Sequence, residues 1–481
     1  MFIRTLLSGL LLTQAPSASD APTREAPEAA APSSPEAAAA SPTAPSSTTA
    51  PSLPVLSFEQ AINLAEKQNP SLEAARARLR QADELSNKAW SGYLPNIVLN
   101  ASYTRQQEVL IPLLPDQPPV AIQQANQLGA QGTLRQALIV PQLWPAIQSA
   151  YLGERVAALT VEDARRQLLF AVAQAYLGAA SLRDSLAVQE QLLEVRRGFE
   201  RDAQVRFDVG DVERLAVLRA TLDRKQAEQE LVRSRNSYAS ARSSLAALLA
   251  RPVDFDVAPP SEPEVAVPAE AANPETAEQT ALDKRQDVGA ARLSVDIARL
   301  GRRQYIFQYF PNLYATGGFT ASNAAGLTGQ TTAWTAGLAL SWTLFDGGLR
   351  EANIREGSAK IAEANANLRG AEQRARDEVR RAALELGTAE VNLKTAEDRV
   401  KIARETARLT KESFEAGAAT YLQVTDINAS LAAAELSAVA EELNLRLSRL
   451  ALARAMGLFD PTGNSLAEPS DMPEPVKSSA R

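Results

Sequence analysis

The chain has 481 residues with 23 glycines, 5% aromatic residues and long runs of helix formers, so we expect mainly α-helical structure with unusually long helices. Its net charge of −7 comes from scattered charges without a basic cluster, which argues against a nucleic-acid partner. It contains no cysteine and no histidine, which excludes disulfides, thiolate or imidazole metal sites, cysteine nucleophiles and histidine general bases. We therefore expect no cofactor, no bound metal and no enzymatic activity.

Residues 1–15, MFIRTLLSGLLLTQA, have the pattern of a secretory signal peptide. Arg4 precedes an apolar run that is too short to span a bilayer, and small residues follow near Ala15. The alternative is an ordinary hydrophobic N-terminal tail. Residues 16–55 are almost entirely Ala, Pro, Ser, Thr and Glu, which bury too little apolar surface to offset chain entropy, so we expect a disordered leader. No later segment has the roughly 18 consecutive apolar residues of a transmembrane helix.

The first folded unit is expected over residues 56–250 and begins with helix. Ser57 and Gln60 form the pattern of a capping box, and helical sequence continues past Pro70 to about Tyr93. These features predict one helix at the start of the unit.

The period changes from helical to alternating after Pro95. Apolar residues then occupy every second position of a strand expected over residues 96–105, with mostly small polar residues between them. The apolar set is Ile97, Leu99, Ala101 and Tyr103. A second strand is expected over residues 131–140, although its alternation is poor.

A very long helix follows, because no proline interrupts the sequence between about Pro145 and Phe207. At 1.5 Å per residue it would reach on the order of 90 Å, more than a globular core requires. Apolar or alanine residues recur every seven positions, as in a coiled coil: Val161, Leu168, Ala175 and Leu182. Gly210 marks a turn into a returning helix over about 211–250.

Residues 251–275 are rich in Pro and Glu and are expected to link two copies of one unit, the second over 276–459. Matching motifs lie 216 positions apart at the strand onset (311 − 95) but 207 apart at the Phe-x-x-Gly turns (417 − 210). The second copy has therefore lost about nine residues (216 − 207), which we assign to the counterpart of segment 106–130.

The second copy predicts strands over 312–322 and 333–345, with clearer alternation than in the first copy. A returning helix is expected over about 418–457, and residues 460–481 are expected to form a disordered tail. The long helix of this copy carries a double seam, made of Leu368, Ala375, Ala382 and Ala389 together with Val379, Leu386, Leu393 and Val400.

Strands of about 10 residues with one apolar and one small polar face are typical of a transmembrane β-barrel, although a half-buried sheet in a soluble α+β protein gives the same alternation. Aromatic residues near the strand ends favour the barrel, because such residues form girdles at both membrane interfaces. They are Trp90, Tyr103, Trp144, Phe319, Trp334 and Trp342. Four strands cannot close a barrel, since about eight is the practical minimum, so several chains would have to share one.

The order of these elements, together with WTLFDGG at residues 342–348, resembles the outer-membrane efflux proteins, the TolC-like exit ducts. The resemblance covers about residues 54–459. It implies a homotrimer in which each protomer gives four strands to a twelve-stranded barrel in the outer membrane of a Gram-negative bacterium, and helices to a periplasmic tunnel. It also implies a passive channel in tripartite efflux or type I secretion. The implied partners are a periplasmic adaptor, an inner-membrane RND or ABC-type transporter and outer-membrane lipid.

The resemblance assigns roles to the two helix turns. Their tips, which contact the adaptor in the family, correspond to Val209, Gly210 and Asp211 in the first copy and to Ala416, Gly417 and Ala418 in the second. Beyond the second tip, family members often carry two acidic residues one helical turn apart that ring the tunnel entrance.

These gate positions are Gln423 and Asp426 here, so one acid is missing, and a basic residue that some members carry is replaced by Ala419. Three copies of Asp426 would concentrate cations at a constriction, while the alternative is a solvated surface aspartate. Tyr421 could line the same entrance or merely pack between helices.

Two other functions remain open at this point. A structural periplasmic coiled-coil protein would explain the helices, but not the duplicated strands or the signal peptide. An enzyme based on carboxylates and arginines would need a glycine-rich phosphate loop or a paired nucleophile and base, and the sequence shows neither.

Overall fold

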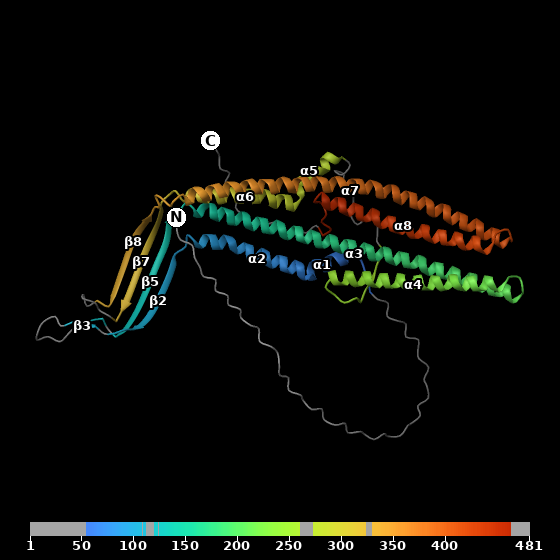
Figure 1. The fold of residues 1–481 in the computed structure, drawn as a ribbon, viewed down its shortest axis with the longest axis horizontal. Helices are drawn as coiled ribbons and strands as arrows, with labels where there is room; N and C mark the ends of the chain where they lie inside the picture. Colours follow the sequence, from blue (N-terminus) through green and yellow to red (C-terminus); the bar gives the residue numbers. More distant parts are fainter. Residues whose placement is uncertain are drawn as a thin grey trace, which may run out of the picture. The chain divides into compact units, whose positions relative to one another are not determined.

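The computed structural model describes residues 54–107, 109–111, 120–123, 125–259, 273–323 and 330–462. The expected signal peptide, nearly all of the expected leader and most of the expected tail lie outside these residues. Helices dominate the described part (Figure 1), which confirms the mainly α-helical class expected from composition.

The first copy runs from helix to strands and back to helix. It comprises helices α1 (Phe58–Gln68) and α2 (Pro70–Ser91), strand β2 (Asn96–Arg105), the short strands β3 (Val109–Ile111) and β4 (Val120–Gln123), strand β5 (Asn126–Ile139), and helices α3 (Leu143–Asp208) and α4 (Arg214–Leu248).

The second copy repeats this order. It comprises helices α5 (Pro274–Lys284) and α6 (Gln286–Phe307), strands β7 (Asn312–Ser322) and β8 (Thr332–Ser341), and helices α7 (Leu349–Glu415) and α8 (Tyr421–Ala455). Corresponding helices match in length: 11 residues in α1 and α5, 22 in α2 and α6, 66 and 67 in α3 and α7, and 35 in α4 and α8. The copies differ between their strands, where residues 106–125 join β2 to β5 but only residues 323–331 join β7 to β8.

The single helix expected from Phe58 to about Tyr93 is in fact two helices, because the chain breaks at Asn69. The ring of Pro70 disfavours helical backbone in the preceding residue. Asn69 is therefore extended (φ −71°, ψ 122°), and its side chain caps α2 by accepting a hydrogen bond from the Ser71 N–H at 2.9 Å. The second copy breaks at the equivalent Arg285 (φ −73°, ψ 129°) without a proline.

Two strands differ from the expected bounds because strand pairing, not local sequence, sets their ends. β5 begins at Asn126 rather than residue 131, since its register with β2 continues until Arg105 pairs with Asn126. β8 ends at Ser341 rather than residue 345, since Ser341 pairs with Asn312, the first residue of β7. Trp342 therefore lies just beyond the strand.

The four long strands form one antiparallel sheet in the order β2-β5-β7-β8. A separate parallel pair joins β1 (Val55–Leu56) to β6 (Asp256–Val257), so the end of the expected leader and part of the expected linker are ordered against each other. The buried Tyr176 hydroxyl donates to the Leu56 carbonyl at 3.1 Å, which ties this pair to α3.

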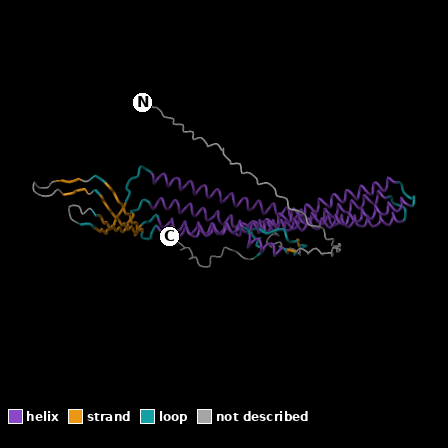
Figure 2. The backbone as a smooth tube through the Cα atoms, turned by 90° about the horizontal axis from the view of Figure 1, so that it is seen from below, coloured by secondary structure: helices purple, strands orange, loops and turns teal. Residues whose placement is uncertain are grey.

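Two antiparallel hairpins, α3 with α4 and α7 with α8, make up most of the helical part, and Figure 2 shows the four-stranded sheet at one end of the long helices. The buried positions of α7 follow the predicted seam, with Ala375, Val379, Ala382, Leu386 and Ala389 all buried. No helix within the described ranges is long and apolar enough to cross a membrane.

The predicted stripe of α3 is only part of its buried surface. Leu168, Ala175 and Leu182 are half-buried, whereas Leu169, Val172, Ala173, Tyr176 and Leu177, which lie off the stripe, are among the fully buried side chains. The reason is that α3 packs against five helices, α1, α2, α4, α6 and α8, rather than against one coiled-coil partner.

Candidate channel wall and helix-turn tips

The sheet has one apolar and one polar face. Strand register aligns apolar residues of neighbouring strands, so that Ile97 lies opposite Leu134, and Phe319 lies opposite Trp334. The alternate positions carry small or polar residues such as Asn100, which lies opposite Gln131. The alternation of β2, β7 and β8 predicted these two faces, whereas the faces of the poorly patterned β5 follow from its register with β2 and β7.

The apolar face is left uncovered in the single chain. Ile97 and Leu99 are each 75% exposed, Trp334 is 78% exposed and Leu338 is 71% exposed. The edge strands β2 and β8 each pair on one side only within the described residues. A sheet with an exposed apolar face and two open edges is incomplete as a single copy in water.

The six aromatic residues predicted to mark a membrane interface form two groups along the strands. Trp90 near the end of α2, Trp144 at the start of α3 and Trp342 after β8 lie at the helix end of the sheet, whereas Tyr103, Phe319 and Trp334 lie toward the opposite end.

The polar groups of Trp90, Trp342 and Tyr103 form hydrogen bonds within the chain. Trp90 Nε1 donates to the Tyr151 hydroxyl at 2.9 Å, Trp342 Nε1 donates to the Tyr309 carbonyl at 3.0 Å, and Tyr103 donates to Asn126 Oδ1 at 2.9 Å. All three rings remain about half exposed or more.

The two helix-turn tips have the same backbone structure. Gly210 and Gly417 have left-handed φ angles of 81° and 75°, which residues with a Cβ adopt only with strain. The next residue in each turn bonds back to the helix: Asp211 N donates to the Arg206 carbonyl, and Ala418 N donates to the Ser413 carbonyl, both at 2.8 Å. Both turns are therefore Schellman caps, whose glycine and following hydrogen bond end a helix and let the chain reverse.

The predicted tips thus sit at the ends of the two hairpins, away from the strands (Figure 1). Val209, the residue before the first tip glycine, is 75% exposed. The guanidinium of Arg206 lies 4.9 Å from the centre of the Phe414 ring, which links the end of α3 to the end of α7. Because of this contact the two tips lie side by side.

The two gate candidates have different environments. Gln423 is part of a capping box at the start of α8: its Oε1 accepts from Thr420 N at 2.8 Å, while Gln423 N donates to Thr420 Oγ1 at 3.4 Å. Asp426 is exposed on the next helical turn, and no ion pair to its carboxylate is present in the described residues. Only Asp426 therefore has a side chain free for another role.

Tyr421 packs between helices, which is the alternative that the sequence left open. Its ring meets Phe199 of α3 edge to face, with centroids 5.8 Å apart, and burial raises the pKa of its hydroxyl. Around it lies a poorly satisfied polar cluster, in which the Tyr421 hydroxyl, Thr425 Oγ1 and Arg196 Nη1 are buried without a hydrogen-bond partner in the described residues. Arg196 Nη1 is 3.7 Å from Asp223 Oδ2.

Sequence comparison identifies the family that shares this architecture. The sequence model described as outer membrane efflux protein matches residues 61–251 and 278–458, which include most of both copies. The chain belongs to the outer membrane efflux protein family. This is a family of channels and not a class of enzymes, and the comparison confirms the resemblance drawn from the duplicated pattern.

Individual relatives of this efflux protein agree with the assignment. The fusaric acid resistance protein FusA of Burkholderia cepacia is 28% identical over 311 residues, covering 62% of this chain and 57% of FusA. The matched part thus spans little more than half the length of that relative.

Solved structures share the fold of this efflux protein. The outer membrane protein VceC of Vibrio cholerae superposes with a TM-score of 0.70 at 20% identity, covering 83% of this chain and 96% of VceC. The CmeC outer membrane channel of Campylobacter jejuni has a TM-score of 0.71 at 15% identity, covering 85% of this chain and 87% of CmeC.

The middle of the helical part of this efflux protein is held by a buried charge network. The fully buried Arg165 side chain binds Glu66 at 2.7 Å, Glu162 at 3.0 Å and Asp460 at 3.3 Å. Asp460 belongs to the segment expected to form a disordered tail, so the first residues of that segment are ordered. The cause is long-range pairing, since Arg165 and Asp460 are 295 positions apart.

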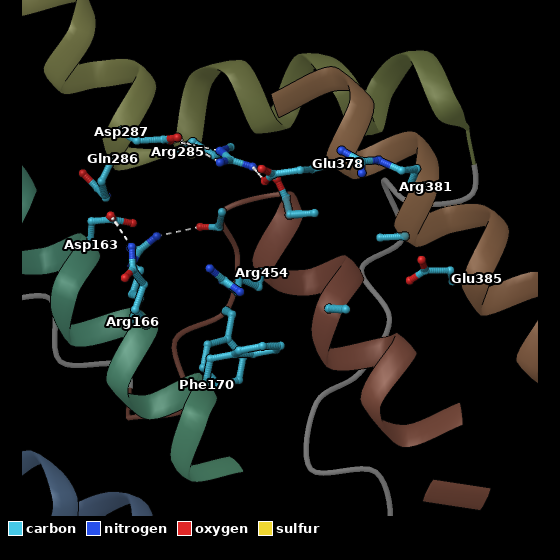
Figure 3. Close-up of a pocket in the computed structure, with 16 residues that line it drawn as sticks. Asp163, Arg166, Phe170, Arg285, Gln286, Asp287, Glu378, Arg381, Glu385 and Arg454 are labelled. Carbon is cyan, nitrogen blue, oxygen red and sulfur yellow. Dashed lines mark hydrogen bonds and ion pairs between the residues drawn. The ribbon is translucent and has the colours of Figure 1, made fainter. Parts of the chain in front are cut away.

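A cavity of about 520 Å³ lies beside this network, between α3, α7, α8 and the break at Arg285 (Figure 3). Arg285 bonds to Asp287 at 2.8 Å and to Glu378 at 2.5 Å, while Arg454 lies over the Phe170 ring at 4.7 Å. The lining contains four arginines and four carboxylates, so formal charges cancel and neither sign of ligand is favoured. No cluster of acidic residues that could hold a metal ion occurs in the described ranges.

Proposed function

We propose that this protein is the outer-membrane exit duct of a tripartite efflux or secretion system, a passive channel that receives cargo from an inner-membrane pump. Family membership supports the channel, and the resemblance to the TolC-like ducts supports the periplasmic extension. The observation that carries the proposal is the sheet, because neither a structural coiled coil nor a soluble enzyme requires an uncovered apolar sheet face.

Closure of the sheet requires further copies of the chain. Open backbone edges are not tolerated in lipid, and four strands cannot close on themselves. Three copies would give twelve strands (3 × 4) and would pair β8 of one protomer with β2 of the next. The apolar face would then contact lipid, and the polar face would line the lumen.

The spacing of the aromatic groups supports this membrane placement. Trp334 and Trp342 are eight residues apart, which corresponds to about 27 Å of extended strand at 3.4 Å per residue, or to about 21 Å along the barrel axis at a strand tilt of about 40°. The apolar band of an outer-membrane barrel is about 25 Å tall and is flanked by aromatic girdles. The two groups would therefore mark the two interfaces.

The helices also expose apolar residues that partner protomers would cover. On α4 the set is Leu215, Leu218 and Leu222, and on α7 it is Leu384, Val391 and Ile402, with exposures between 51% and 68%. These residues repeat at helical spacing, as a helix face that packs on another helix does. They support a homotrimer whose helices together enclose a tunnel.

Roles at the tunnel end follow from the same proposal. The tips around Gly210 and Gly417 would contact the periplasmic adaptor, and three copies of Asp426 would form a ring at the entrance. Because position 423 holds an amide rather than an acid, the ring would hold one carboxylate per protomer, that of Asp426. Such a ring raises the local cation concentration.

Membrane placement is tested by two neighbouring substitutions on opposite faces of β8. Leu338 lies midway between Trp334 and Trp342, so Leu338→Arg is expected to cost about 2 to 4 kcal/mol and to deplete assembled trimers in the outer-membrane fraction. Ala339→Arg, the matched control, adds the same side chain to the lumen face and should leave assembly nearly unchanged. Equal effects of both variants would overturn the barrel assignment.

The gate is tested separately by single-channel recording. Asp426→Asn should weaken cation preference and block by multivalent cations, and Gln423→Asp should strengthen both. Gln423→Glu is the control for the capping box, because Glu also serves at the third helical position. Unchanged selectivity and block in Asp426→Asn would show that Asp426 is an ordinary surface residue.

A further inference from the structure

The polar face of the sheet carries one charged side chain, that of Arg135 on β5. The register fixes this assignment, because Arg135 pairs with Asn96 on β2 and with Thr316 on β7, both polar-face positions. The remaining polar-face positions of the four described strands hold only Asn, Gln, Ser, Thr, Tyr, Gly, Ala and Val. Arg135 is therefore the exception on a face whose other side chains are uncharged.

The guanidinium of Arg135 is held in place without being neutralised. It lies 4.0 Å from the centre of the Tyr314 ring on the neighbouring strand, a stacking distance that restricts its motion. No carboxylate of the described residues forms an ion pair with it, and Arg135 remains exposed. An arginine keeps its charge at any physiological pH, so this face presents a fixed positive charge.

The position along the strand is also defined. Arg135 lies four residues before the end of β5 at Ile139, so it belongs to the helix end of the sheet. In the proposed duct this is the level where the helical tunnel leads into the barrel. The three copies of a trimer would place three such charges around the lumen at one height.

We propose that Arg135 makes the barrel selective for anions, so that anions are the cargo class favoured at this level of the duct. This inference rests on the proposed function, since it needs a closed barrel with the polar face inside. A ring of fixed charge on a low-dielectric wall raises the concentration of counter-ions in the pore. The ring opposes the sign of Asp426, so the two ends of the duct have opposite preferences.

The test is the reversal potential of the purified trimer in planar bilayers under a potassium chloride gradient, repeated with potassium benzoate. Arg135→Gln should lower the anion-to-cation permeability ratio at least roughly twofold for both anions. Arg135→Lys should retain most of the anion-to-cation permeability ratio because it keeps the charge. Arg135→Glu should have a lower ratio than Arg135→Gln, because it reverses the charge.

Arg105→Gln is the matched control. Arg105 is the last residue of β2 and has the parity of the apolar row, so its loss should leave the ratio unchanged. If wild-type channels conduct but wild type, Arg135→Gln and Arg135→Glu have equal anion-to-cation permeability ratios, the role of Arg135 is overturned while the proposed duct stands. Wild-type trimers that form no channel would instead refute the proposed duct, and with it the inference.

Discussion

Two arginines on helix α3 are almost completely buried, but they are satisfied to very different degrees. Arg165, in the middle of the helical part, contacts three carboxylates within 3.3 Å. Arg196, toward the hairpin tip, has Asp223 at 3.7 Å and the Thr425 carbonyl at 3.4 Å. The partners of Arg165 come from α1, α3 and the segment after α8, whereas those of Arg196 come from α4 and α8.

The difference indicates that local stability is higher in the middle of the helical part than near the hairpin tip. A buried charge is costly unless short hydrogen bonds replace its hydration. Arg165 in the middle meets this condition. Arg196 toward the tip meets it only weakly, and nearby the Tyr421 hydroxyl and Thr425 Oγ1 are buried without a hydrogen-bond partner in the part of the chain that the structure describes. Regions with fewer satisfied interactions open at lower free energy, so the tip is expected to separate before the middle does.

Removing Arg165 should have the largest effect. Arg165→Leu removes the guanidinium that bonds the fully buried Glu162 at 3.0 Å, and it should cost about 3 to 5 kcal/mol of unfolding free energy. Denaturant unfolding of the purified protein, followed by circular dichroism, measures this loss. Arg165→Lys is the control. Its unfolding free energy should lie between those of wild type and Arg165→Leu, because lysine keeps the charge but lacks the planar set of guanidinium donors. A loss below about 1 kcal/mol in Arg165→Leu would contradict the comparison.

Two glycines with similar left-handed backbones provide a matched pair. A Cβ at Gly457 (φ 72°) would lie 2.9 Å from the Lys284 carbonyl carbon and 3.0 Å from Arg285 N, whereas a Cβ at Gly417 (φ 75°) would meet nothing within 4 Å. Gly417→Ala should cost about 1 to 2 kcal/mol from backbone strain alone. Gly457→Ala should cost about 2 to 4 kcal/mol, because overpacking against backbone is added. Equal melting temperatures for the two variants would contradict the larger loss of stability expected for Gly457→Ala.

Replacing Arg196 should be nearly neutral. Arg196→Met removes a buried charge with poor partners and leaves Asp223 partly exposed to water, so the change in unfolding free energy should stay within about 1 kcal/mol of zero. The same denaturant measurement applies. A loss similar to that of Arg165→Leu would mean that the tip is held as firmly as the middle.

The smallest expected effect concerns Asp163 in the cavity of Figure 3. Burial raises the pKa of its carboxyl, and Asp287 raises it further, while Arg285 and Arg454 act in the opposite direction. The folded state therefore binds a proton more tightly than the unfolded state, and stability falls as pH rises from the ordinary Asp value of 3.8 through the folded pKa. Asp163→Asn should thus gain stability relative to wild type at about pH 7 but not at about pH 4, by less than about 1 kcal/mol. Melting temperatures at both pH values test this, and a gain of the same size at both would exclude a titration effect.

The duplication and the helix-to-strand changes could be predicted because their signals are local or repeat at fixed spacing. Prolines 95 and 311, the alternating rows and the glycine turns all act on neighbouring residues. Strand ends could not be predicted in the same way. The end of β8 depends on where β7 begins, and β7 begins more than 20 residues earlier in the chain.

The candidate site shows the same limit. Arg165 has partners 99 and 295 positions away, and no local pattern marks it as buried. Gln423 is different, since Thr420 and Gln423 repeat the capping-box spacing already recognised at Ser57 and Gln60. Arg135 could also have been found, because it interrupts a row that is otherwise uncharged, but the poor alternation of β5 hides that row in the sequence.

The equal arms of the two hairpins restrict how this protein can change in length. Helices α4 and α8 both have 35 residues, and α8 returns along α7, whose buried positions follow a repeat close to seven. Adding seven residues moves a turn by about 10 Å while nearly preserving which face is buried, whereas adding five residues, for example, rotates that face by about 140°. An insertion would have to be made in both arms of both hairpins to keep the two tips level. The two hairpins would therefore lengthen or shorten together, with matched insertions or deletions in all four of these helices.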